Sequence, residues 1–343
     1  MGKFNTLDIL SSNNFARQSN VVFSEVISKE EFKKLNVKSL KIVYENENGV
    51  CYINTKLSIN ENDIIFSNTD FIEYLFKKLS NIENLENLKL ITQWSDKTID
   101  EQTFSLKPNS ISNWYGVHID YEHDNLRPIP LGLSGEYSNK NLTPKYFQKN
   151  EFENLDKKNL LYINFQKNTN DTERSKITDI FENLEWVKID QPNLELDEYL
   201  NEIKSSHFVL CPFGNGVDTH RLWETLYAGS IPIIKKHVSY ETTKDLPVLQ
   251  VDSFEEITKD YLNEVLEKMN KRQFNYEKLN SKFWMNIISS YKIESRENQY
   301  IRLSLIYFYK IKINYNIERF INRLKKKFIF RKNQILKKTK VIS

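Results

Sequence analysis

Residues 208–234 read FVLCPFGNGVDTHRLWETLYAGSIPII, and this stretch decides the fold. It opens as an apolar strand that ends before Pro212, because proline cannot donate a hydrogen bond to a neighbouring strand. Gly214, Asn215 and Gly216 form the turn that follows. The two glycines allow a tight turn and bring no Cβ, so a ligand can come close to the backbone there.

A helix follows this turn, and its start is a predicted anion site. Asp218 or Thr219 caps the helix, and Gly229 ends it in the left-handed conformation that glycine adopts readily. The free N–H groups and the positive end of the helix dipole favour a phosphate in the first turn. His220 and Arg221 lie at the same end and add further donors.

Glu224 lies three residues beyond Arg221, about one turn further along the same face. A carboxylate repels phosphate but accepts hydrogen bonds from ribose hydroxyls. The spacing therefore predicts a nucleotide diphosphate, with its diphosphate at the helix start. The plainer alternative is that Arg221 and Glu224 pair only with each other. The stretch has neither Gly-x-Gly-x-x-Gly nor a Gly-Lys-Ser/Thr ending, which disfavours dinucleotide oxidoreductases and P-loop NTPases.

The alternation of strand and helix extends to both sides of this stretch. Apolar runs bounded by turn residues predict further strands, and helices are expected to begin near 172, 196 and 219. Alternating elements of this kind predict a doubly wound α/β domain. The predicted strands are 160–165, 186–189, 208–210, 231–234 and 248–251.

The first half of the chain shows a less regular version of the same alternation. Two prolines and a glycine within residues 127–133 indicate a crossing between two domains. The elements predicted before this crossing are strands over 40–44, 63–66 and 89–92 and a helix over 70–80.

Length and composition agree with two globular domains. The chain has 343 residues, of which 39% are hydrophobic and 28% charged, so a disordered protein is excluded. Two cysteines cannot form a disulfide framework, and no run of the sequence is apolar enough to span a membrane. We expect domains at 1–140 and 141–290 and a C-terminal segment at 291–343.

The net charge of +3 hides a strongly basic tail. Without the tail's cations the chain would be acidic, which disfavours nucleic acid as a partner. Phe320, Leu324 and Phe328 recur every four positions among the tail's basic residues, a pattern typical of a helix on an anionic membrane surface. A solvated tail whose apolar side caps the neighbouring domain is the alternative. The basic residues are Arg319, Arg323, Lys325, Lys326, Lys327, Arg331, Lys332, Lys337, Lys338 and Lys340.

The string from Phe213 to Pro232 resembles the donor-site motif of exostosin-like GT-B glycosyltransferases, which occur among bacterial and large-virus surface-glycan enzymes. Residues 128–133 and 162–174 are similar to two other segments of that family, and 93–96 to a loop of its first domain. The resemblance implies an α/β protein of GT-B type, with two Rossmann-like doubly wound domains facing a cleft. The basic amphipathic helix at the C-terminus lies outside the resemblance.

The resemblance also implies a reaction, the transfer of a sugar from a nucleotide diphosphate sugar to a hydroxyl group. Arg221, with the helix start and Arg174, would neutralise the leaving diphosphate, and Glu224 would hold the ribose. The implied donor-binding residues are Arg174, Gly214, Asn215, Gly216, Asp218, Thr219, His220, Arg221 and Glu224.

An enzyme that inverts the anomeric carbon, as the resemblance implies, needs a general base in the first domain. Asp96 is the first choice, because it sits where a strand ends and matches the family's loop. Asp120 and His118 follow, with His123 and Asp124 behind them.

Residues 118–124 also permit a metal site, because imidazole and carboxylate groups together suit Mn or Zn. These groups bunch in one loop without a recognised ligand spacing, and the sequence has no Asp-x-Asp motif, which metal-dependent GT-A enzymes use. We therefore expect no metal and no cofactor beside the nucleotide sugar.

Two alternatives to a glycosyltransferase remain open at this point: another nucleotide-sugar enzyme such as an epimerase, and a non-catalytic scaffold that binds nucleotide or glycan. The expected partners are a nucleotide diphosphate sugar, a glycan or lipid-linked acceptor, and an anionic membrane surface contacted by residues 319–340. The expected location is cytoplasmic, with peripheral attachment to the membrane.

Overall fold

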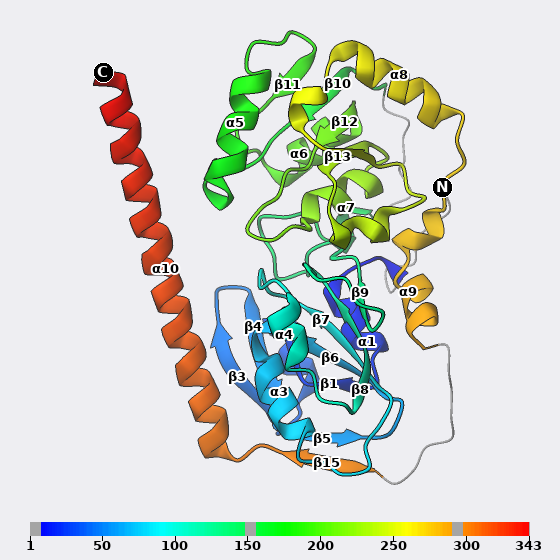
Figure 1. Cartoon of the computed structure of the whole chain (residues 1–343), viewed down its shortest axis with the longest axis vertical. Helices are drawn as coiled ribbons and strands as arrows, with labels where there is room; N and C mark the ends of the chain where they lie inside the picture. Colours follow the sequence, from blue (N-terminus) through cyan, green and yellow to red (C-terminus); the bar gives the residue numbers. More distant parts are fainter. Residues whose placement is uncertain (1–7, 148–155, 290–297, 343) are drawn as a thin grey trace.

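Two five-stranded parallel sheets organise the chain, one in each half (Figure 1). The structure is a computed structural model that describes residues 8–147, 156–289 and 298–342. Helices accompany both sheets, so the predicted mixed α/β fold class is confirmed. The predicted division between residues 140 and 141 falls in the segment that joins the two sheets.

The strands of the first sheet follow chain order, so this sheet lacks the reversal that the predicted doubly wound arrangement would show. Asn68 ends its second strand and caps the short 3₁₀ turn Thr69–Phe71 that leads into helix α3 (Ile72–Leu79), so the predicted helix over 70–80 is confirmed. Two further helices belong to this domain, α1 (Ser12–Gln18) and α4 (Glu101–Ser105). The strands are, in sheet order, β1 (Val21–Val22), β6 (Ile64–Asn68), β7 (Leu88–Gln93), β8 (Ile111–Gly116) and β9 (Leu126–Pro128).

An antiparallel sheet interrupts this domain between β1 and β6. Its strands are β2 (Ser24–Ser28), β4 (Gly49–Asn54) and β3 (Leu40–Glu45), in that order, and α2 (Lys29–Leu35) follows β2. The predicted strand over 40–44 exists, but it belongs to this antiparallel sheet and not to the parallel one. β5 (Lys56–Ile59) pairs with β15 (Gln299–Arg302), far along the chain.

The second sheet is doubly wound, because its strand order reverses direction between β10 and β12. All five strands predicted here are confirmed, and Gly229 follows the predicted helix with a φ of +75°. The strands are, in sheet order, β11 (Val187–Ile189), β10 (Asn159–Ile163), β12 (Ser206–Leu210), β13 (Ile231–Lys235) and β14 (Leu249–Val251). The helices are α5 (Asp171–Phe181), α6 (Leu196–Lys204), α7 (His220–Tyr227) and α8 (Lys259–Asn270).

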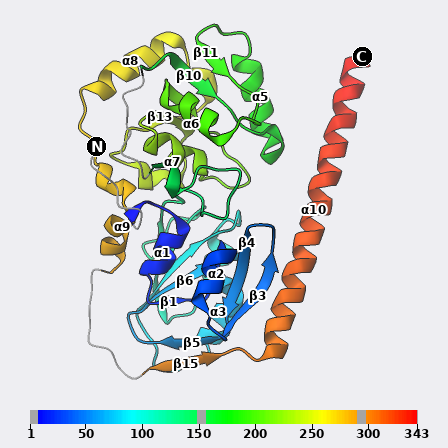
Figure 2. The ribbon, with the colours of Figure 1, turned by 180° about the vertical axis from the view of Figure 1, so that it is seen from behind.

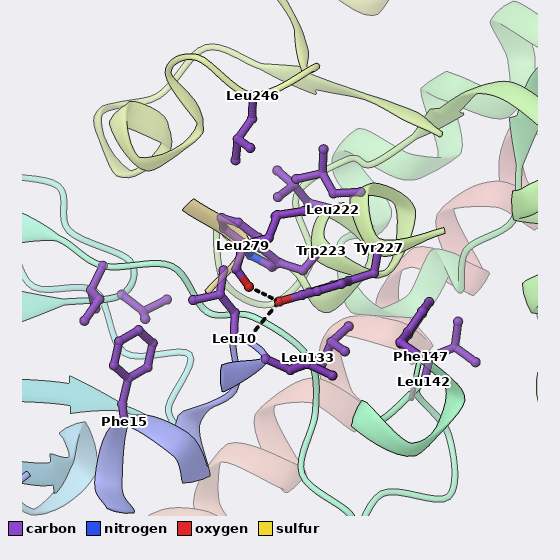
Figure 3. Close-up of a cluster of buried hydrophobic side chains, with 14 of the residues drawn as sticks. Leu10, Phe15, Leu133, Leu142, Phe147, Leu222, Trp223, Tyr227, Leu246 and Leu279 are labelled. Atoms are coloured by element: carbon purple, nitrogen blue, oxygen red, sulfur yellow. Dashed lines mark hydrogen bonds between the residues drawn. The ribbon is translucent and has the colours of Figure 1, made fainter. Parts of the chain in front are cut away.

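A continuous apolar cluster joins the two domains (Figure 3). It packs Leu10 and Phe15 from the N-terminal domain and Leu133 from the connecting segment with Trp223 and Tyr227 of α7. The Tyr227 hydroxyl accepts the Leu10 backbone N–H at 2.8 Å and donates to a carbonyl oxygen of the second domain. Burial of this much apolar surface fixes the two sheets relative to each other.

The chain returns to the N-terminal domain over its last segment (Figures 1 and 2). Helix α9 (Ser281–Ile288) packs on α1, β15 pairs with β5, and the long helix α10 (Leu305–Ile342) lies along β3. The predicted boundary between residues 290 and 291 lies outside the described residues, as do the side chains at 326, 327 and 329–342 of the basic tail. None of the helices in the described ranges has the length and apolar character needed to cross a membrane.

Candidate active site

The predicted donor motif lies at the switch point of the second sheet. The loop 211–219 connects the carboxyl end of β12 to α7, and β12 lies beside β10, where the strand order reverses. Ligands of doubly wound sheets bind outside the carboxyl ends of the strands at this point. The sequence motif and the sheet topology therefore indicate the same place independently.

Arg221 and Glu224 meet at this edge through a tyrosine that the sequence did not single out. Arg221 donates from Nη1 to the hydroxyl of Tyr199 at 2.8 Å, and its guanidinium lies 5.3 Å from the centre of the Tyr199 ring. The Tyr199 hydroxyl in turn donates to Glu224 Oε2 at 3.0 Å. Tyr199 comes from α6, so this relay also joins α6 to α7.

Glu224 is buried, and both of its oxygens have partners in the protein. Besides Tyr199, the backbone N–H of Leu142 donates to its Oε1 at 3.0 Å. Burial raises the pKa of Glu224, and the neighbouring Arg221 opposes this rise. Glu224 thus anchors the connecting segment, and its predicted contact with ribose stays a prediction.

Arg174 ties the ends of β10 and β12 together. Its Nε donates to the carbonyl of Phe213 at 2.8 Å, and its Nη1 donates to the carbonyl of Gln166 at 2.8 Å and to the Thr169 hydroxyl. Burial, and secondly the positive charge of Arg221, lower the pKa of Arg174 to about 10. The positive charge of Arg221 thus acts on Arg174, and such an environment favours a bound anion.

The glycines of the motif are explained by contacts within the protein. A Cβ on Gly216 would lie 2.4 Å from the imidazole of His118, and one on Gly214 would lie 3.2 Å from Arg174 Nη2. Asn215, between them, is exposed. The predicted close approach to the backbone is present, but at Gly216 the approaching group is a side chain of the first domain.

His118 and Asp218 join the carboxyl ends of the two sheets. His118 follows β8, has a φ of +60°, and accepts the Asp218 N–H on its Nδ1 at 3.2 Å. The Asp218 carboxylate accepts the backbone N–H of Leu131 at 2.9 Å and the indole N–H of Trp223 at 2.9 Å. Burial lowers the pKa of His118 to about 4 and raises that of Asp218 to about 7.

The start of α7 is only partly available to a ligand. His220 donates from Nδ1 to the carbonyl of Gly132 at 2.8 Å, so it too contacts the connecting segment. Thr219 is the N-cap residue, and its side chain makes no capping hydrogen bond. The Thr219 hydroxyl oxygen is buried and has no hydrogen-bond partner within the described ranges. This hydroxyl could therefore donate a hydrogen bond to an oxygen atom of a ligand.

The predicted bases lie in different surroundings. Asp96 is exposed beyond the end of β7, and His118 is a weak base because burial lowers its pKa. Asp120 is 65% exposed, and its Oδ1 lies 3.7 Å from Nε2 of His237, a residue of the second domain. The His237 ring stands edge-on to Phe213, with ring centres 5.9 Å apart. Asp120 is therefore linked through His237 and Phe213 to Arg174.

The remaining predicted groups lie apart from this arrangement. His123 packs its ring against Phe104, with ring centres 4.6 Å apart, and the Asp124 carbonyl accepts a hydrogen bond from Arg127. Cys211 is a buried thiol whose pKa burial raises to about 12. In the described part of the chain, no three His, Cys, Asp or Glu side chains gather closely enough to hold a metal ion.

Comparisons with known proteins place these residues in a family context. The model of a family described as the RXYLT1 C-terminal domain, which is related to glycosyltransferases, matches residues 152–329, just over half of the chain. None of the curated proteins matches the chain. Among solved structures, a crystal structure of an alpha1,3-fucosyltransferase is similar, with 13% sequence identity, a TM-score of 0.38, and coverage of 79% of this chain and 88% of the other.

Proposed function

This chain belongs to the RXYLT1 C-terminal domain family, a glycosyltransferase-related family, and from this premise we propose that it is a glycosyltransferase. It would transfer a sugar from a nucleotide diphosphate sugar to a hydroxyl of a glycan or lipid-linked acceptor. The glycosyltransferase part of the predicted resemblance is thereby supported, and its exostosin-like detail stays a prediction.

The observation that carries this proposal is the pair of guanidinium groups at the switch point. Arg174 and Arg221 come from α5 and α7; Arg174 donates to the Phe213 carbonyl in the loop 211–219, and Arg221 lies in the first turn of the helix that follows this loop. The negative charge of a diphosphate would compensate the positive charges of these two arginines. The Thr219 hydroxyl offers a further hydrogen-bond donor. In our proposal Arg221 contacts the diphosphate, and Arg174 positions the loop that holds it.

We propose that the transfer inverts the anomeric carbon, as the resemblance implies. A base takes the proton of the acceptor hydroxyl while the acceptor oxygen forms a bond to the anomeric carbon. The bond from this carbon to the diphosphate oxygen breaks, and Arg221 stabilises the negative charge of the departing nucleoside diphosphate. Two cations from the protein can do this without a metal ion, so we keep the proposal of metal independence.

Asp120 is the base that the geometry favours among the predicted candidates. Its Oδ1 lies 3.7 Å from Nε2 of His237 in the second domain, and this nitrogen carries the ring proton because Nδ1 accepts the Ser239 N–H at 3.2 Å. His237 would hold the carboxylate in place. Asp96 stays the second candidate, because it is exposed at the end of the neighbouring strand β7.

The proposal includes peripheral attachment to the cytoplasmic face of a membrane. The basic residues 319–340 would contact anionic lipid headgroups there, each contributing about 1 kcal/mol. An acceptor linked to a lipid would then lie near the enzyme.

Nucleotide binding at the motif tests the donor site. We expect one of UDP, GDP, CMP or dTDP, or its sugar, to bind saturably in calorimetry without added metal, and Arg221→Ala to weaken this binding at least tenfold because a charge-assisted hydrogen bond is lost. Arg272→Ala is the matched control, since Arg272 is an exposed arginine of the same domain. Equal affinity in wild type and Arg221→Ala would refute the site, and silence across the panel at millimolar concentration would favour the scaffold alternative.

A further inference from the structure

Helix α10 is apolar on two opposite faces, and only one of them is covered. Its inner face packs on the N-terminal domain: Phe308 and Ile311 are buried, and Tyr315 stacks on Tyr44 of β3 with ring centres 5.4 Å apart. The guanidinium of Arg319 lies 4.4 Å above the same Tyr44 ring. These contacts fix the first half of α10 to the domain that contains the candidate base.

The outer face carries a straight row of exposed apolar side chains. Ile306 is 84% exposed and Phe328 is 72% exposed, and the members between them are exposed as well. The row repeats every eleven residues, which is close to three full turns of an α-helix, so its members stay on one face. The row consists of Ile306, Tyr309, Ile313, Ile317, Phe320, Leu324 and Phe328.

A shallow groove lies along this part of the helix. It has a volume of about 480 Å³ and is lined by Tyr309, Lys312, Ile313, Asn316, Ile317 and Phe320. Lys312 is the one cation in this lining, and its Nζ donates to the carbonyl of Ile42 in β3 at 3.1 Å. A row of this length on an otherwise polar surface indicates a face that meets an apolar partner.

Charge decides between the possible partners. From residue 305 to residue 342 the sequence has a single acid, Glu318, against the ten basic residues of the tail and also Lys310 and Lys312. Two copies of this helix packed against each other would bring like charges together, which is destabilising. A surface of anionic lipid offers hydrocarbon to the row and negative headgroups to its basic flanks.

We propose that the outer face of α10, from Ile306 to Phe328, lies on an anionic lipid surface and holds the N-terminal domain against it. The attachment therefore starts well before residue 319 and depends on apolar burial as well as on the basic tail. Because α10 is fixed to the domain that carries Asp120, the lipid contact keeps the candidate base in the domain attached to the membrane. The lipid contact rests on the membrane attachment proposed above and extends it to the apolar row, but it does not depend on sugar transfer.

Co-sedimentation of the full chain with vesicles tests the proposal. We expect the protein to bind vesicles of phosphatidylcholine and phosphatidylserine much more tightly than vesicles of phosphatidylcholine alone. The double variant Ile313→Asp/Ile317→Asp should weaken this binding at least tenfold, because it places two charges where apolar side chains enter the membrane interface. Its thermal unfolding and nucleotide binding should equal those of wild type.

The matched control is Val37→Asp/Leu106→Asp, which adds the same charge at two exposed apolar residues of the N-terminal domain outside α10. This control should bind the vesicles as wild type does. Equal loss in both double variants would mean that net charge alone governs binding, and it would overturn the role of the row. Full vesicle binding by Ile313→Asp/Ile317→Asp would also overturn the proposal. So would a wild-type dimer that persists in the presence of vesicles and that this double variant abolishes. Neither result depends on whether the chain binds a nucleotide.

Discussion

At the scale of single residues, the imidazole of His118 shows why the interface between the domains is sensitive to protons. Its Nδ1 accepts the Asp218 N–H, so this nitrogen must be unprotonated for the contact to exist. The ring is 3% exposed, and burial lowers its pKa from 6.5 to about 4. The contact that joins the two sheets therefore depends on a neutral histidine.

This dependence predicts a loss of stability in acid. Between pH 6.5 and about pH 4 the unfolded chain binds a proton on His118 that the folded protein does not bind. The contribution of His118 to the free energy of unfolding is therefore complete above pH 6.5 and is lost as the pH falls through this window. His118→Asn removes the titrating ring, while asparagine tolerates the positive φ and offers an oxygen to the Asp218 N–H. We expect its unfolding free energy, from urea denaturation, to vary less with pH in this window. Identical pH profiles for the two proteins would refute the assignment.

At the scale of elements, the relay from Arg221 through Tyr199 to Glu224 connects two helices to the donor site. α6 supplies the tyrosine and α7 supplies both charged groups. Tyr199 satisfies a guanidinium and a buried carboxylate with one hydroxyl. Removing such a partner from a buried charged group lowers the stability of the folded protein, because water cannot replace the lost hydrogen bond.

Tyr199→Phe should therefore destabilise the protein by about 1–3 kcal/mol, because Glu224 Oε2 loses the hydrogen bond that satisfies it. Urea unfolding followed by fluorescence measures this difference. The control is Tyr276→Phe, which removes the hydroxyl of a partly exposed tyrosine in the same domain and should change the unfolding free energy little. Equal stability of the two variants would show that the relay contributes nothing.

At the scale of the whole molecule, the second domain could be predicted from sequence more completely than the first, where the predicted strands over 63–66 and 89–92 and the helix over 70–80 exist but other strands were missed. Parallel strands buried on both faces appear as short apolar runs between turn residues, which is why 208–210 and 231–234 were identified correctly. β4 begins at Gly49, which reads as part of a turn, and β5 pairs with β15, a strand about 240 residues later. No local pattern contains a pairing at that distance.

In the candidate site, too, local features could be predicted from the sequence and contacts between the domains could not. Arg174, Arg221 and the glycine turn could be found because their spacing is local. The approach of His118 to Gly216 and the pairing of Asp120 with His237 cross the two domains, so the sequence alone gave no sign of them. The reason for Gly216 is thus a packing constraint from the other domain, although the same residue type would also suit a bound ligand.

The central claim is that Arg221 binds a diphosphate at the switch point, in a loop that Arg174 positions, and a comparison of three ligands with the same base tests it most directly. Calorimetry on the wild-type protein would measure the dissociation constants of the nucleoside, its monophosphate and its diphosphate. We expect the diphosphate to bind at least about tenfold more tightly than the monophosphate, because the second phosphate adds charge-assisted hydrogen bonds to the Arg221 guanidinium and the start of α7. Equal affinity for all three ligands would contradict it.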